Sequence, residues 1–545
     1  MREHRNIFIL LLLSTFALLV TVGSYGVIET SDARYAEIAR EMFVSQDWLH
    51  PNLLDVHHYH KPPITYQITA LGYKLFGINT FGARFFLQIS ILLQIVLVYL
   101  LTLQFTQTKR TALWSATIYF TFPLVLIASR NLTTDSFLTL FVLLSIYAWV
   151  RYRKEGRFGW MYLFTIALGL GFLTKGPVVF LAPFIFALLY NRSEVSKRAW
   201  NLHHFLAWTL FFLIASSWFI YLALDNPAFL DYFIGKQTID RFSNNVFHRS
   251  EPFWYFIALA PLLGMPWLLA LPWMVKKSIM PNIKTILTTK DIKVTLLLSV
   301  LIPLLFFSAS TSKRVLYILP LYPLLAVSIA LLLEKLPKQN IKNLLKGMTL
   351  YALFIFAFLG LAPWIDMKID FPTYLTPLSL ILIAITLWLT FKSTMEDKDK
   401  TVLITFMTAV YFLLSATALF SYSIKSFKIA TPVVNWLKKE NLDKKEILVY
   451  NKRLPSLAFE LNKSIISLYA GNRSLNREVQ FEKESTYKRF LYNIQESKER
   501  ERLKRTLNHK DSVLILYKQS IPKEQRWLIN HYTHTKEISK WKIYY

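Results

Sequence analysis

The sequence predicts an all-α, multi-pass membrane bundle followed by a small C-terminal α/β domain outside the cytoplasm. Hydrophobic residues make up 54% of the 545-residue chain, and long apolar runs recur from the N-terminus to about residue 422. An α-helix needs about 20 apolar residues to cross the hydrocarbon core of a bilayer. Because lipid offers no hydrogen-bond partners, the backbone groups of each run must pair within that run, so the runs are expected to be helices.

The lengths of the apolar runs predict about 13 transmembrane helices. The first run follows Arg2 and Arg5 as a signal peptide would, but it is too long for a signal core and lacks a small-residue cleavage site. The less apolar stretch 64–78 is expected to lie at the membrane interface. Short runs between 160 and 190 leave open one hairpin or a re-entrant pair. The expected spans lie near residues 7–28, 82–105, 111–128, 134–150, 160–174, 177–190, 204–224, 253–274, 293–310, 315–333, 345–364, 374–391 and 402–422.

The placement of charge predicts the orientation of the bundle. The net charge of +28 could suggest nucleic-acid binding, but many basic residues lie in short loops between the runs, as in cytoplasmic loops. These basic loops are residues 106–110, 151–159, 191–203, 276–290 and 334–342. The alternate loops 29–81 and 225–252 are long and mixed in charge, and residues 366–370 are acidic. The N-terminus is therefore expected inside, with the long loops and the C-terminal tail outside, and no nucleic-acid partner is expected.

Two domains are expected, a transmembrane domain over residues 1–424 and an extracytoplasmic α/β domain over residues 425–545. Residues 446–451 and 511–517 have the composition of strands, as does the shorter run 464–469, and residues 487–507 have the charge density of an exposed helix. The tail has no Gly-rich phosphate-binding fingerprint. The chain has no cysteine, which excludes disulfides and thiolate chemistry.

The first outside loop contains many polar residues for a chain this apolar. From Asp32 onward the charges recur at helical spacing and predict an amphipathic helix lying on the bilayer. Pairing three and four residues apart explains Glu37, Arg40 and Glu41 as ordinary surface charges. Glu29 and Asp32 differ, because they stand where the first span leaves the membrane, a costly place for carboxylates without a partner or a task.

The loop continues with a histidine cluster and a constrained lysine. Two prolines follow Lys61 and restrict its backbone to an extended conformation, which suits a cation that binds a lipid phosphate. A plain positive anchor before the interfacial helix explains Lys61 as well. The histidines at 57, 58 and 60 make a divalent metal an expectation, with His58 and His60 as ligands, although such spacing also occurs without a metal.

Further charges lie at helix ends on the side of the membrane assigned to the outside. They are Arg130, Asp135, Lys175 and Lys313. Long basic side chains at a span end can simply reach toward water. Several cations at the same face are better explained by an anionic headgroup.

At these residues the sequence resembles the first-loop signature of the bacterial aminoarabinose transferases. These enzymes group with the protein O-mannosyltransferases among the membrane-embedded GT-C glycosyltransferases. The resemblance covers the whole membrane portion. It is carried by Glu29–Met42, Asp47–Trp48 and Tyr59–Pro63, and further by Gly169–Pro177 and Leu319–Pro323.

The resemblance implies a glycosyltransferase of the bacterial inner membrane, with its active site and C-terminal domain on the periplasmic face. Such enzymes move a sugar from a polyprenyl-phosphate donor to a lipid A-like glycolipid or another cell-envelope acceptor. The family has an acidic pair in this loop. Here Ser31 stands at the first acidic position and Asp32 at the second, while Glu29 offers a nearby carboxylate. His60 replaces a glutamate that is a suspected metal ligand in some members.

The resemblance and the residues together give each candidate a role. Asp32 or Glu29 would act as general base on the acceptor, and Asp135 would be a second acid. Donor phosphate would be held by Arg34 and Lys61, with further cations at Arg130, Lys175 and Lys313. A single displacement would invert the anomeric configuration.

Other functions remain open at this point. A protein O-mannosyltransferase-type enzyme or a lipid-linked-oligosaccharide ligase would use the same kind of donor. A transporter or flippase would show mid-span charges and broken helices in matched halves, which the sequence does not display.

Overall fold

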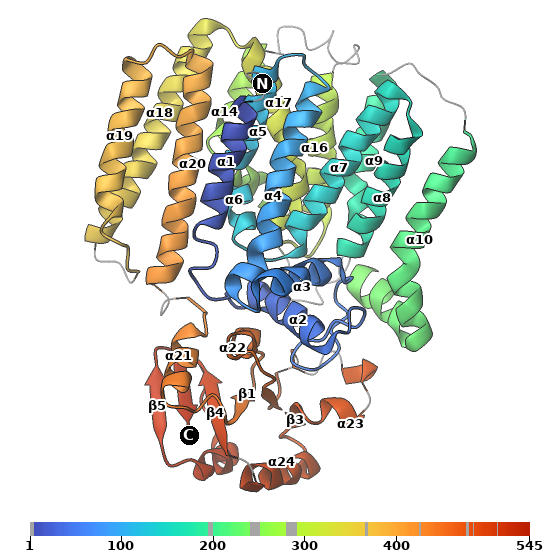
Figure 1. The fold of residues 1–545 in the computed structure, drawn as a ribbon, viewed down its shortest axis with the longest axis vertical. Helices are drawn as coiled ribbons and strands as arrows, with labels where there is room; N and C mark the ends of the chain where they lie inside the picture. Colours follow the sequence, from blue (N-terminus) through green and yellow to red (C-terminus); the bar gives the residue numbers. More distant parts are fainter. Residues whose placement is uncertain are drawn as a thin grey trace. The chain divides into compact units, whose positions relative to one another are not determined.

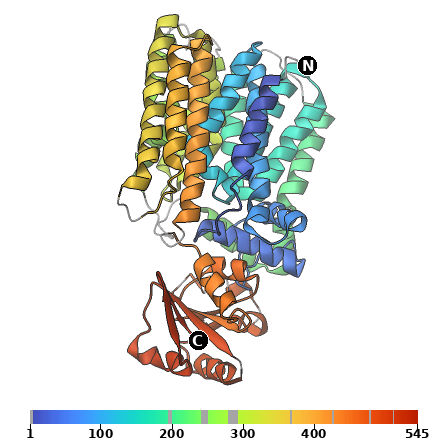
Figure 2. The ribbon, with the colours of Figure 1, turned by 60° about the vertical axis from the view of Figure 1, so that its left-hand side comes forward.

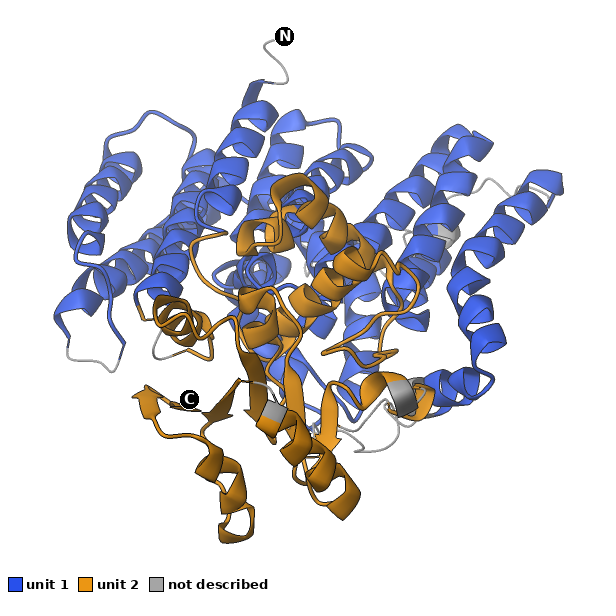
Figure 3. Cartoon of the chain, turned by 60° about the horizontal axis from the view of Figure 1, so that its bottom comes forward, with its two compact units in different colours: residues 1–22, 86–422 blue, residues 23–85, 423–545 orange. Residues whose placement is uncertain are grey.

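The fold is described from a computed structural model of the chain. It describes residues 5–193, 200–239, 251–278, 292–365, 369–423, 427–472, 474–475, 479–482, 484–509 and 511–545. Arg2 and parts of the loops 191–203, 225–252, 276–290 and 366–370 lie outside these residues. The chain forms two compact units, unit 1 with residues 1–22 and 86–422 and unit 2 with residues 23–85 and 423–545 (Figure 3). The chain returns to unit 2 after residue 422, and residues 23–85 group with the C-terminal part, while the predicted domain bounds 1–424 and 425–545 stay a prediction.

Unit 1 is a bundle of helices, and the long ones run side by side (Figures 1 and 2). Its elements are α1 (Arg5–Leu19), α4 (Thr80–Leu103, which begins in unit 2), α5 (Lys109–Thr121), α6 (Pro123–Ser129), α7 (Thr134–Glu155), α8 (Phe158–Lys175), η2 (Pro177–Phe180), α9 (Leu181–Ser193), α10 (Leu202–Asp225), α11 (Ala228–Asp231), η3 (Tyr232–Ile239), α13 (Tyr255–Leu263), α14 (Trp267–Ser278), α16 (Ile292–Ala309), η5 (Val315–Leu321), α17 (Tyr322–Lys335), α18 (Lys338–Leu361), η6 (Ala362–Trp364), α19 (Leu375–Phe391) and α20 (Asp397–Tyr422).

Among the described residues, eight helices are long and apolar enough to cross a membrane, or up to 10 if two bent pairs each form one span. The pairs α5/α6 and α13/α14 bend by 63° and 95°. The apolar helices Arg5–Leu19, Pro177–Tyr190 and Leu375–Phe391 are shorter. Every predicted run overlaps a helix, but the predicted number of about 13 spans is not confirmed. The length of an apolar run does not reveal a break inside that run. Such a break occurs before Pro123, the first residue of α6.

The surface of unit 1 fits a membrane environment. Large apolar side chains are exposed on several of its helices, among them Phe8 on α1, Leu224 on α10, Phe354 on α18 and Phe391 on α19. Contiguous exposed apolar surface marks a place where another apolar phase covers a protein. The chain is a multi-pass membrane protein.

Unit 2 combines the first loop with an α/β sheet. Its elements are α2 (Ser31–Ser45), α3 (Ile64–Phe76), α21 (Thr431–Lys439), β1 (Glu446–Tyr450), α22 (Pro455–Leu461), β2 (Ile466–Tyr469), η7 (Val479–Phe481), α23 (Glu484–Tyr487), β3 (Leu491–Asn493), α24 (Ser497–His509), β4 (Ser512–Tyr517), η8 (Lys523–His531), β5 (Thr535–Ile538) and β6 (Trp541–Tyr544).

The sheet has the strand order β3-β2-β1-β4-β6-β5. Strands β3, β2, β1 and β4 are parallel to one another, and β6 runs antiparallel to both of its neighbours, β4 and β5. The three predicted strands are confirmed as β1, β2 and β4, whose apolar residues form the buried centre of the sheet. The sequence did not predict β3, β5 and β6, which have three or four residues each. The predicted charged helix is confirmed as α24, although part of its range forms β3.

Candidate active site in the first loop

Asp32 lies in a buried ion pair at the start of α2. Its Oδ2 accepts a hydrogen bond from the backbone N–H of Ile28 at 3.0 Å and pairs with Nη2 of Arg84 at 2.5 Å. Arg84 is fully buried at the start of α4 and also donates to the carbonyls of Tyr25 and Gly26. This guanidinium therefore ties the segment before α2 to the carboxylate of Asp32.

Arg84 was not singled out in the sequence. The signal was present, because it is a cation next to Phe85 and Phe86 where an apolar run begins. A charge at such a place needs a partner. Asp32 supplies that partner.

Glu29 has a different environment from Asp32. Its Oε1 accepts a hydrogen bond from the backbone N–H of Ser456 in α22 at 2.8 Å. Its Oε2 is buried and lacks a hydrogen-bond partner among the described residues. Burial raises the pKa of Glu29 from 4.5 to about 7, while the hydrogen bond from Ser456 and the charges of Arg453 and Lys452 oppose that rise. Near neutral pH this carboxylate can hold or release a proton.

The charged face of α2 is inside unit 2. Glu37 is fully buried and receives two hydrogen bonds from Arg40, at 2.7 and 2.6 Å. Glu41 accepts from the backbone N–H groups of Leu54 and Asp55 at 2.6 and 3.1 Å. Burial and the charges of Asp55 and Glu37 raise the pKa of Glu41 well above its ordinary value. The predicted helix is confirmed, but its exposed charged face is wrong, because α3 and α22 pack against α2.

Arg34 and Lys61 are in the same unit as the two acids. Both are partly exposed. Arg34 lies two residues after Asp32, so the two side chains leave α2 in different directions. While Asp32 faces the interior, the Arg34 guanidinium lies 5.4 Å from the Tyr35 ring and keeps access to the surface.

In unit 1 the structure brings Asp135 and Lys175 together. Asp135 is in the first turn of α7, Lys175 ends α8, and the two side chains form an ion pair. The Lys175 ammonium also lies 4.3 Å from the centre of the Tyr317 ring. Two residues that are 40 positions apart in the sequence thus form one charged cluster.

Arg130 and Lys313 have protein acceptors for their N–H groups. Arg130 donates to the carbonyls of Ala17 and Leu18 at the end of α1, and to Gln88 and Thr417. Lys313 donates to the carbonyls of Ser310 and Glu251 at 2.6 and 2.7 Å, and burial lowers its pKa. These contacts hold the local chain together, and the predicted phosphate contacts of both residues stay predictions.

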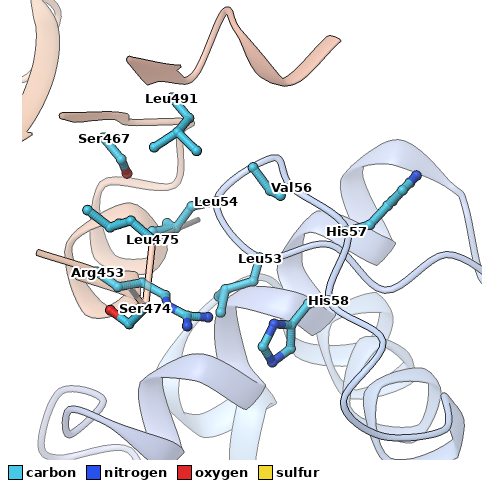
Figure 4. Close-up of a pocket in the computed structure, with 10 residues that line it drawn as sticks. All are labelled: Leu53, Leu54, Val56, His57, His58, Arg453, Ser467, Ser474, Leu475 and Leu491. Atoms are coloured by element: carbon cyan, nitrogen blue, oxygen red, sulfur yellow. The ribbon is translucent and has the colours of Figure 1, made fainter. Parts of the chain in front are cut away.

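The structure shows how the three histidines of the first loop lie. The rings of His58 and His60 pack on each other with centroids 3.9 Å apart. Among the described residues, no group of three His, Cys, Asp or Glu side chains is placed to hold a metal ion. His57 and His58 instead line a mostly apolar pocket of about 20 Å³ in unit 2, together with Leu53 and Leu54 (Figure 4). That volume holds roughly one water molecule. The metal stays a prediction, and no chemical step is derived from it.

Comparisons with known proteins agree with this architecture. Residues 7–233 match the family model of dolichyl-phosphate-mannose-protein mannosyltransferases. An undecaprenyl phosphate-α-4-amino-4-deoxy-L-arabinose arabinosyl transferase of Pseudomonas aeruginosa is 31% identical over 389 residues, 69% of this chain and 69% of that protein. The enzyme of the same name from Erwinia tasmaniensis is 31% identical over 307 residues, 55% of this chain. The match spans about half the length of that relative, 54%.

A solved structure matches almost the whole chain. The crystal structure of ArnT from Cupriavidus metallidurans bound to undecaprenyl phosphate has a TM-score of 0.79 and 17% identity, and the match covers 99% of this chain and 98% of that one. The spanning bundle with its α/β unit is thus the fold of that membrane transferase structure. The sequence shows the family, because the Pseudomonas aeruginosa enzyme is 31% identical over 69% of both chains. The chain belongs to the undecaprenyl phosphate-α-4-amino-4-deoxy-L-arabinose arabinosyl transferase family.

Proposed function

We propose that the protein transfers a sugar from a polyprenyl-phosphate donor to a lipid A-like glycolipid at the periplasmic face of the inner membrane. The donor named for the relatives, undecaprenyl phosphate-α-4-amino-4-deoxy-L-arabinose, is the first candidate for this chain. The observation that carries the proposal is Glu29 in the family's signature loop, a partly exposed residue whose Oε2 is buried and whose pKa is raised to about 7.

The reaction is a single displacement at the anomeric carbon. The acceptor oxygen forms the new bond to carbon while the bond between carbon and the phosphate oxygen breaks. The electron pair of that bond leaves with the polyprenyl phosphate. If the acceptor is a hydroxyl, its proton passes to Oε2 of Glu29. A base with a pKa near the working pH is suited to this step.

Asp32 is assigned as a positioning residue. Its carboxylate is buried and paired with Arg84, so it holds the turn that carries Glu29. The partly exposed Arg34 and Lys61 are proposed to bind the donor phosphate and to stabilise its charge as it leaves. The positive charges of Lys452 and Arg453 lower the pKa of Glu29, and they are proposed to attract an anionic acceptor.

The test uses full-length protein in lipid nanodiscs with radiolabelled polyprenyl-phosphate sugars and a panel of acceptors. Glu29→Gln should lower transfer about 10²- to 10⁴-fold, the usual contribution of a general base. Glu501→Gln, on the exposed surface of α24, is the matched control and should retain full activity. Transfer by Glu29→Gln at the wild-type rate, or no transfer from any donor, would contradict the proposal.

Two further readouts test the finer points. Product NMR should show an inverted anomeric centre, and retention would rule out a single displacement. Dialysis against a chelator followed by addition of Mg²⁺ or Mn²⁺ tests the predicted metal at His58 and His60.

A protein acceptor is the second candidate. It is favoured by the match of residues 7–233 to the protein mannosyltransferase model. An acceptor panel that contains glycolipids and unfolded peptides separates the two, because each class gives a distinct labelled product.

A further inference from the structure

The sheet of unit 2 has an edge at which many α/β folds bind ligands. From β1 the chain passes to β2 and β3 on one side of β1, and it returns to β4 on the other side. These four strands are parallel, so β1 and β4 end beside each other, at Tyr450 and Tyr517. In open parallel sheets, ligands bind outside the carboxyl ends of the strands, at the place where the strand order reverses in this way. We call this place the carboxyl edge.

The residues that follow β1 and β4 bring positive charge to the carboxyl edge. Lys452 comes two residues after the end of β1, and Lys518 directly follows β4. The Lys452 ammonium lies 4.3 Å from the centre of the Tyr517 ring, and the Lys518 ammonium lies 5.9 Å from it. Lys452 also donates a hydrogen bond to the carbonyl of Tyr517 at 3.4 Å. Both cations are therefore held near the last residue of β4.

The charge balance at the carboxyl edge is positive. Burial and the charges of Lys428 and Lys518 lower the pKa of Lys452, whereas the charge of Glu29 raises it. In the part of the chain that the structure describes, none of these three lysines forms an ion pair. The carboxylate that opposes them is Glu29, whose own pKa is about 7. Three cations near one weak acid attract an anion.

Buried polar atoms lie at the same strand end. The Tyr517 hydroxyl and Oε1 of Gln519 are buried and have no hydrogen-bond partner among the described residues, and Tyr517 is only 3% exposed. Burial and the charge of Glu29 raise the pKa of Tyr517, so its hydroxyl keeps its proton as a donor. The amide of Gln519 donates to the carbonyl of Asn451 after β1 at 3.3 Å, which leaves Oε1 as an acceptor. Buried polar groups nearly always have a partner, and a polar ligand would supply one.

We propose that the carboxyl edge binds a phosphorylated sugar of the acceptor. Its phosphate accepts hydrogen bonds from Lys452, Lys518 and the Tyr517 hydroxyl. The sugar hydroxyls donate to Oε1 of Gln519 and approach Glu29. The assignment to the acceptor rests on the proposed function, since this subsite places a phosphorylated glycolipid beside the proposed base.

The test measures binding of the acceptor without a donor, so its result does not depend on transfer. Full-length protein in neutral detergent is titrated in a calorimeter with a phosphorylated disaccharide glycolipid, and with the same glycolipid after removal of its phosphates. The phosphorylated form should bind at least about fivefold more tightly. Equal affinities would overturn the subsite. Preferential binding without transfer from any donor would support the subsite and contradict the proposed function alone.

Two lysine variants locate the phosphate on the sheet. Lys518→Gln should weaken binding of the phosphorylated glycolipid about fivefold, the effect of one cation near an anionic headgroup, and should leave the dephosphorylated form unaffected. Lys444→Gln is the matched control, because Lys444 is exposed at the opposite edge, before β1 begins. It should bind as the wild type does. Equal losses in the two variants would indicate general attraction to a basic domain and would overturn the proposal.

A tyrosine pair tests the hydroxyl separately from the charge. Tyr517→Phe keeps the ring and should weaken binding of the phosphorylated glycolipid at least about tenfold, the effect of a hydrogen bond to a charged group. Its unfolding temperature should not fall, because the hydroxyl has no partner among the described residues. Tyr450→Phe is the control, since its hydroxyl donates to Gln525 and its ring packs with Leu516 on the other face of the sheet. Wild-type affinity of Tyr517→Phe would contradict the subsite.

Competition identifies the source of the phosphate. Inorganic phosphate at millimolar concentration should lower the apparent affinity of the wild-type protein for the phosphorylated glycolipid. Phosphatidylglycerol, a phosphodiester without a sugar, should compete at least about fivefold more weakly than unlabelled phosphorylated glycolipid does. Equal competition by phosphatidylglycerol would make the carboxyl edge a general lipid site and would overturn the assignment to a phosphorylated sugar.

Discussion

Glu29 and Asp32 are three residues apart, yet their surroundings differ. Asp32 has a guanidinium at 2.5 Å, whereas Glu29 accepts from one backbone N–H, and its buried Oε2 has no hydrogen-bond partner in the part of the chain that the structure describes. Desolvation favours the protonated form of a carboxylic acid, and at Glu29 it outweighs the opposing charges of Arg453 and Lys452. This difference is the reason why we propose Glu29 for the proton transfer and Asp32 as a positioning residue.

The raised pKa of Glu29 predicts how activity depends on pH. The base must be deprotonated, so transfer should increase as the pH rises through about 7 and should fall at lower pH. Glu29→Gln should remove this rise and leave a low, nearly flat profile. Initial rates between pH 5.5 and 8.5 at saturating donor check this. A wild-type profile without a rise in that range would contradict the role of Glu29.

The same pKa shift predicts a pH dependence of stability. Between 4.5 and 7 the folded state holds the proton of Glu29 more tightly than the unfolded state does. The contribution of Glu29 to the free energy of unfolding should therefore decrease as the pH rises through this window. The unfolding temperature of Glu29→Gln, compared with wild type from pH 4.5 to 7.5, should show a smaller decrease with rising pH.

The pair of Asp32 and Arg84 predicts a double-mutant cycle. Removing one partner of a buried ion pair costs about 3–5 kcal/mol, because the other charge stays buried without compensation. Arg84→Met should thus destabilise the protein more than the double variant with Asp32→Asn. Unfolding in detergent, followed by tryptophan fluorescence, gives the coupling energy. Strictly additive effects would show that the pair is not coupled.

At the scale of elements, α22 and the segment before α2 pack closely. A Cβ at Gly26 would collide with Glu460 of α22 and with Thr431 of α21. Burial raises the pKa of Glu460 to about 7. The C-terminal sheet unit therefore contributes directly to the shape of the segment that carries Glu29.

This packing predicts different effects on stability for two glycine-to-alanine substitutions. Gly26→Ala should lower the unfolding temperature and the transfer activity, because the side chains of Glu460, Thr431 and Ile429 around it must shift. Gly347→Ala in α18 meets no atom within 4 Å and should be neutral or stabilising by up to about 1 kcal/mol. Thermal unfolding of both variants checks this, and equal effects would contradict the packing at Gly26.

The sequence pattern of α2 predicted its helical conformation but not its burial. Residues three and four apart predicted the helix correctly, because that spacing is a local property of the chain. The same pattern predicted an exposed face, yet Glu37 and Arg40 are buried. Their burial depends on α3 and α22, and α22 lies more than 400 positions further along the chain. Local spacing contains no information about such partners.

For the whole molecule, loop charge predicts a cytoplasmic N-terminus and a periplasmic C-terminal sheet. The absence of cysteine allows a direct test with single cysteines in the natural background. Lys536→Cys in β5 should react with a membrane-impermeant maleimide in intact spheroplasts, whereas Gln107→Cys, between α4 and α5, should react only after permeabilisation. Both residues are exposed. The reverse labelling would invert the topology.

The apolar runs of the sequence were enough to predict the membrane bundle and the central strands, whereas the site in the first loop stays a prediction. Each of these depends on composition and short-range periodicity, as in the runs that form α4 and β4. The tertiary structure decided which carboxylate is paired, because Arg84 lies 52 residues after Asp32 and Ser456 lies 427 residues after Glu29. The ionisation of an acid depends on the charges and dipoles around it in space. Those neighbours are brought together only when the chain folds.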